Sequence, residues 1–91
     1  MDLSALPGHE LIRQGLEDLA HGRESEAALL VLIGAPRLRR LGLGVPGATA
    51  GGAEHRLYQL LARADPDSAH SRYNALIRRL VRFERAAECA A

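Results

Sequence analysis

Apolar residues recur along this chain at spacings of three and four, the period that places side chains on one face of an α-helix. The longest such pattern predicts a helix from about Pro66 to Glu88, with Asp65 as its N-cap. Ile77 and Val81 widen the apolar seam, which is typical of a helix packed in a bundle. The seam itself consists of Ala69, Tyr73, Leu76, Leu80, Phe83 and Ala87.

Two shorter segments show the same helical period. The first predicts a helix over residues 8–21, and the second a helix over 53–64. Gly15 lies in the middle of the first helix, where it indicates close packing against a neighbouring helix. The residues expected to face inward are Leu11, Ile12, Leu16, Leu19 and Ala20 in the first helix, and Leu57, Leu60, Leu61 and Ala64 in the second.

The segment 27–33 is apolar on all sides, which predicts a central, buried helix. Ser25 is a suitable N-cap for it, and Glu26 places an acidic side chain in its first turn. A buried strand is the alternative for these residues. Gly34 and Pro36 then change the chain direction and predict a short helix that ends at about Leu41.

The elements together predict an all-α fold, a compact helical bundle of four main helices plus one short helix. We expect residues 1–91 to form a single helical domain. Residues 1–7 form an irregular arm in this prediction, and residues 42–52 form a Gly-rich loop between the third and fourth helices.

The composition narrows the class of protein. The net charge is +1, with 12 basic residues, all of them Arg, against 11 acidic ones, so the chain lacks the strong excess of an outright nucleic-acid module. Cys89 is the one cysteine, which excludes an internal disulfide. No apolar run approaches the roughly 20 residues that span a bilayer. We therefore expect a cytoplasmic protein without membrane contact, bacterial in its Arg-rich composition.

Arginines supply the sharpest candidate site. Arg78, Arg82 and Arg85 share the face of the last helix opposite its seam, Arg72 and Arg79 flank them, and Glu84 and Glu88 fall on the other flank. Guanidinium groups match phosphate oxygens, so this face is a candidate phosphate contact. A solvated face is the favoured interpretation, because positive charge suits the C-terminal half of a helix and no aromatic residues alternate with the arginines. A second cluster consists of Arg37, Arg39 and Arg40.

An acidic and polar face on the first helix is a candidate partner for the arginines. It consists of Glu10, Gln14, Glu17 and His21. Asp18 and His21 also have the spacing of half a bundle metal site, but no second carboxylate–His pair completes it, so we interpret them as an exposed acid–His pair. We therefore expect no metal and no cofactor.

The polar residues that follow the fourth helix resemble a catalytic set only in sequence. Asp65, Asp67, Ser68, His70 and Ser71 are better explained as a helix cap with a polar first turn. No base, nucleophile and oxyanion stabiliser occur together, so we expect no catalytic residues.

These features favour a small, non-enzymatic protein-interaction module. Spare apolar helix surface in so short a chain favours self-association, most simply as a homodimer. The alternative is a nucleic-acid-associated accessory protein that uses the Arg face of the last helix.

Overall fold

The computed structural model describes residues 3–46 and 52–90, and the prediction of an all-α bundle is confirmed there. The elements are a 3₁₀ turn (Leu3–Ala5) and the helices α1 (His9–Ala20), α2 (Glu26–Ile33), α3 (Ala35–Arg40), α4 (Ala53–Ala64) and α5 (Ala69–Ala90). The arm predicted as irregular thus contains one helical turn. Residues 47–51 of the predicted loop 42–52 lie outside the described residues, and its described residues, 42–46 and 52, belong to no helix.

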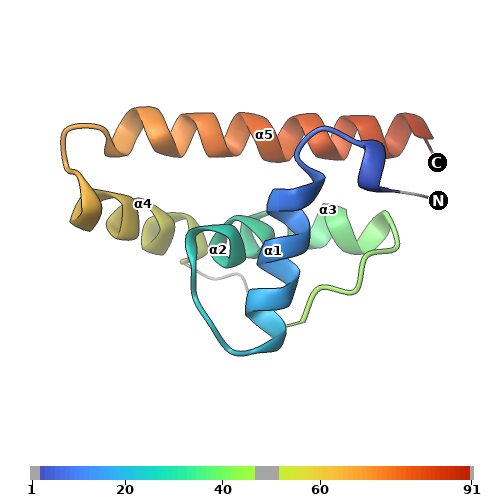
Figure 1. Ribbon diagram of the computed structural model, residues 1–91, viewed down its shortest axis with the longest axis horizontal. Coiled ribbons are helices and arrows are strands. Elements are labelled where there is room, and N and C mark those ends of the chain that lie inside the picture. The colour runs from blue at the N-terminus through green and yellow to red at the C-terminus, as the bar shows by residue number, and fades with distance from the viewer. Residues whose placement is uncertain (1–2, 47–51, 91) are drawn as a thin grey trace.

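Helix α2 is the centre of the molecule. Residues Glu26–Ile33 are helical, which excludes the strand alternative, and six of these eight residues are buried, as predicted. The Ser25 hydroxyl accepts a hydrogen bond from the backbone N–H of Ala28 at 3.1 Å, so the predicted N-cap is also confirmed. Both α1 and α4 pack on α2, and Figure 1 shows α2 enclosed by its neighbours.

Helix α5 lies along one edge of the molecule (Figure 1). Its N-terminal half packs on α4, where the rings of Tyr58 and Tyr73 meet edge to face with their centroids 5.9 Å apart. Its buried side chains Leu80 and Phe83 join the core that α2 and α1 form. The seam predicted from sequence therefore faces inward, and Figure 1 shows no element on the opposite side of α5.

The start of α5 differs from the prediction. The helix begins at Ala69, and Asp65 does not cap it. The Asp65 carboxylate instead accepts hydrogen bonds from the backbone N–H of Asp67 at 3.1 Å and from the hydroxyl of Ser68 at 2.9 Å. These bonds close a separate turn before the helix, because a short acidic side chain readily bonds the backbone two residues on.

Candidate interaction surface

Three arginines form a row along the outer side of α5. Arg78, Arg82 and Arg85 are all exposed and lie at the spacing of one helix face. None of them forms an ion pair with a carboxylate of the part of the chain that the structure describes. The structure therefore brings these three predicted site residues together as a positive row, of which Arg85 also helps to lower the pKa of Glu88 on the same helix.

Apolar side chains lie directly beside this row. Ile77 and Val81 are partly buried, one helical turn apart. Together with the three arginines they line a hollow of about 350 Å³. A shallow apolar surface edged with positive charge thus occupies the outer flank of α5.

A second hollow continues this surface across to the bend between α2 and α3. It has a volume of about 300 Å³ and shares Ile77 and Val81 with the first hollow. Its remaining lining residues are Ile33, Gly34, Pro36, Arg37, Arg40, Leu80 and Glu84. We call the apolar residues Ile33, Pro36, Ile77 and Val81 the α5 strip, and the exposed arginines Arg40, Arg78, Arg82 and Arg85 its basic rim.

The other two predicted arginines of the last helix lie away from the strip. Arg72 forms an ion pair with Glu26 of α2 at 3.2 Å, so its charge is compensated within the chain. Arg79 is exposed near the start of α1, where its backbone carbonyl lies against Gly8. The five-arginine face expected from sequence is thus a row of three.

The three arginines of the second cluster make different contacts. Arg37 donates from Nε to Glu88 at 2.5 Å and pairs through Nη1 with Glu84 at 3.4 Å. Arg39 donates to the backbone carbonyl of Val45 at 3.1 Å. Arg40 is exposed and belongs to the rim. Glu84 and Glu88 form ion pairs with Arg37, and among the described residues the arginines of the row form none.

Glu84 is a buried charge that the sequence pattern did not identify. Its side chain is 4% exposed, beneath the bend at Gly34. Burial raises the pKa of this carboxyl group, and the nearby Arg37 offsets part of that shift. Glu88 behaves in the opposite way, because the hydrogen bond from Arg37 lowers its pKa. The two glutamates lie on the same helix, and their pKa values shift in opposite directions because of where each lies relative to α3 and its Arg37.

All residues of the predicted acidic face are exposed: Glu10, Gln14 and Glu17 of α1, and His21 directly after it. Three of its members are engaged within the chain, and His21 contacts the backbone carbonyl of Glu17 at 2.8 Å. Glu17 pairs with Arg13 at 3.5 Å, and Gln14 donates to Asp18 at 3.0 Å. The net negative charge that this face offers to a partner is therefore small.

Asp18 has a structural role, and the interpretation of Asp18 and His21 as an exposed pair is wrong. Asp18 is 6% exposed and accepts a hydrogen bond from the Ser25 hydroxyl at 2.5 Å. It also pairs with Arg23 at 3.0 Å. The hydrogen bond from Ser25 is the main cause of its lowered pKa. His21 contacts the backbone carbonyl of Glu17 instead.

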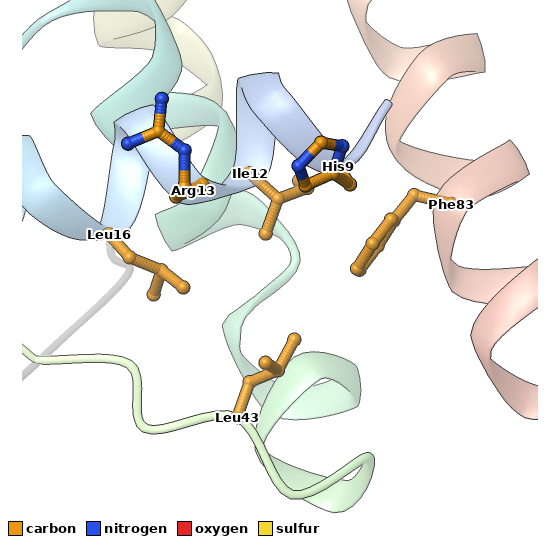
Figure 2. A pocket seen from close by; sticks show the side chains of 6 residues that line it. All are labelled: His9, Ile12, Arg13, Leu16, Leu43 and Phe83. Carbon is orange, nitrogen blue, oxygen red and sulfur yellow. The ribbon is translucent and has the colours of Figure 1, made fainter. Parts of the chain in front are cut away.

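An apolar hollow between α1, α5 and the loop after α3 is the next candidate. Figure 2 shows Ile12 of α1, Phe83 of α5 and Leu43 of the loop pointing toward a common space. The volume of this hollow is about 210 Å³. Leu16 completes the apolar wall, and His9 and Arg13 are its polar lining residues. Such a surface supports apolar contact and brings together no nucleophile and base.

The remaining polar clusters have structural explanations. The residues after α4 form the turn closed by Asp65, and His70 pairs with Asn74 at 3.1 Å rather than with a serine. Within residues 3–46 and 52–90, no three His, Cys, Asp or Glu side chains are grouped so as to hold a metal ion. In the same ranges no helix is both long and apolar enough to cross a membrane.

Comparison with known proteins assigns no family: no family model, no curated protein and no solved structure matches this chain.

Proposed function

We propose that this protein is a non-enzymatic protein-interaction module whose docking surface is the α5 strip. The observation that carries the proposal is the combination of partly open Ile77 and Val81 with three unpaired arginines beside them. An apolar centre with a charged rim is the usual composition of a protein-binding surface. Self-association, which the sequence predicts, is one form that this function can take.

The solution mass of the protein tests whether it associates with itself through the α5 strip. We would measure it by light scattering behind a sizing column, at moderate and high salt, for the wild type, Val81→Ser and Leu16→Ser. Leu16 lines the other apolar hollow and serves as the matched control. A dimer that only Val81→Ser dissociates supports self-association through the strip, whereas one that only Leu16→Ser dissociates contradicts it.

The same mass measurement tests whether the positive charge of the row contributes to self-association. If acidic residues of a second copy contact the row, changing Arg78 and Arg82 to Glu weakens the assembly. An unchanged mass would exclude this electrostatic form. A monomeric wild type leaves another protein as the partner.

A nucleic-acid-associated function is the second candidate, and the unpaired arginine row favours it. Phosphate contacts predict binding that weakens steeply as salt rises. Titration of labelled single- and double-stranded oligonucleotides at several salt concentrations measures this directly. Binding without salt dependence, or no binding, would exclude this function.

A further inference from the structure

We propose that the occupant of the α5 strip is an amphipathic helix of another protein, apolar on one face and acidic along its edges. This inference rests on the proposed docking function and names the partner's chemistry.

The shape of the surface suits a helix. Its two hollows meet at Ile77 and Val81, so together they form one continuous depression beside α5. Ile33 and Pro36 lie across it, on the α2–α3 side. A docked helix fills such a groove with apolar side chains at spacings of three and four.

The charges on its lining select the partner's edges. Arg78, Arg82 and Arg85 stand on one side of the depression, and Arg40 lines the other. Glu84 is the acidic lining residue, and its charge is already paired with Arg37. Carboxylates along both edges of an incoming helix would therefore meet guanidinium groups.

A second copy of this chain fits the strip less well. Its acidic helix α1 buries its apolar face in its own core, where Ile12 is 2% exposed. Helix α1 of the second copy therefore has no exposed apolar row that could fill the depression. Two strips pressed together around a two-fold axis would bring the arginine row of one copy against the row or against Arg40 of the other, depending on the direction of the axis, and in both cases like charges repel.

A nucleic acid would use the row but leave the apolar centre without a role. Phosphate recognition needs donors and positive charge, and the hollow contains Ile77 and Val81 between the two sides of the rim. Burial of this apolar surface contributes only when the partner is apolar as well.

The test compares three labelled synthetic peptides of about 18 residues, long enough for partial helicity. The first is an amphipathic helix with Leu on one face and Glu elsewhere. The second replaces every Glu with Gln. The third keeps the composition of the first but scatters its Leu residues around the helix. Fluorescence anisotropy gives each Kd at about 0.1 M salt, where the Debye length is about 10 Å.

Matched variants place the binding on the strip. Arg82→Gln with Arg85→Gln removes two rim charges, and Arg13→Gln with Arg63→Gln removes two exposed charges elsewhere. We expect the acidic amphipathic peptide to bind about tenfold more tightly than either other peptide. The rim double variant should lose about tenfold in affinity, and the control double variant less than about twofold. Val81→Ser should weaken the same peptide, and thermal unfolding of each variant verifies its fold.

Each contrary outcome is distinct. Equal binding of the Gln peptide, lost in Val81→Ser, would overturn the acidic partner while the docking function stands. Equal binding of the scattered peptide would reduce the effect to unspecific charge attraction and overturn the inference. A dimer dissociated by Val81→Ser would assign the strip to a second copy. Binding of an oligonucleotide and of no peptide would overturn both proposals.

Discussion

The backbone carbonyl of Ala27 in α2 lies directly against Gly15 in α1, so that no Cβ atom fits between them. A methyl group there would also fall 2.5 Å from Cγ2 of Val31. The two helices therefore approach to backbone contact at this point, and α1 holds its position because residue 15 has no side chain.

Gly15→Ala should destabilise the protein by about 2 kcal/mol, since overpacking outweighs the better helix propensity of Ala. Urea unfolding followed by circular dichroism measures the change. Gly44→Ala is the control, because a Cβ there meets nothing within 4 Å, and its effect should stay within about 0.5 kcal/mol. A neutral Gly15→Ala would contradict the close approach.

Ser25→Ala should cost about 1 kcal/mol of stability, because the N-cap of α2 loses its side-chain acceptor. The substitution also removes the hydroxyl that donates to Asp18. Ser71→Ala, at an exposed position of α5, is the matched control and should be nearly neutral. Equal effects of the two substitutions in thermal unfolding would argue against the cap.

Asp18 should make the protein sensitive to strong acid. Its pKa is lower in the folded state than the ordinary value of 3.8, so its stabilisation is present above that value. The stabilisation is lost as pH falls through the folded pKa. Asp18→Asn should be less stable than the wild type at pH 7, and the difference should shrink with acidification. Unfolding free energies measured across this range would contradict the account if the difference stayed constant.

Glu84 and Glu88 should have opposite pH effects. Burial raises the pKa of Glu84 above 4.5, so its contribution grows as pH falls from neutral through that raised pKa, and Glu84→Gln should abolish this gain. The pKa of Glu88 is lowered, so Glu88→Gln should lose stability at neutral pH and recover the wild-type level in acid. The same unfolding series measures both, and parallel curves for the two variants would contradict the assignment.

The sequence predicted the helix bounds well where residues that interrupt a helix lie on both sides. Helix α4 begins and ends as predicted because Gly52 and Asp65 interrupt the pattern on either side. The start of α5 was misplaced because Asp65 and Pro66 suit a turn as well as a helix N-terminus. Side-chain type does not distinguish the two.

The candidate surface was predicted only in part. Helical spacing identified the row of Arg78, Arg82 and Arg85, because neighbours on one helix follow from the period alone. It could not separate Arg72 from the row, since the partner Glu26 lies on a distant helix. It also expected Ile77 and Val81 to widen the core seam; Ile77 does pack against the core, and the structure leaves both side chains partly open. Their exposure depends on how far α3 reaches, which local patterns do not encode.

The central claim is that a partner docks on the α5 strip, and amide chemical shifts test it most directly. The ¹⁵N-labelled protein would be titrated with the acidic amphipathic peptide and the shifted resonances mapped on the fold. The account predicts changes concentrated at residues 33–40 and 74–85, with α1 and the outer face of α4 unaffected. Changes centred instead on His9, Arg13 and Leu43, around the apolar hollow of Figure 2, would contradict it.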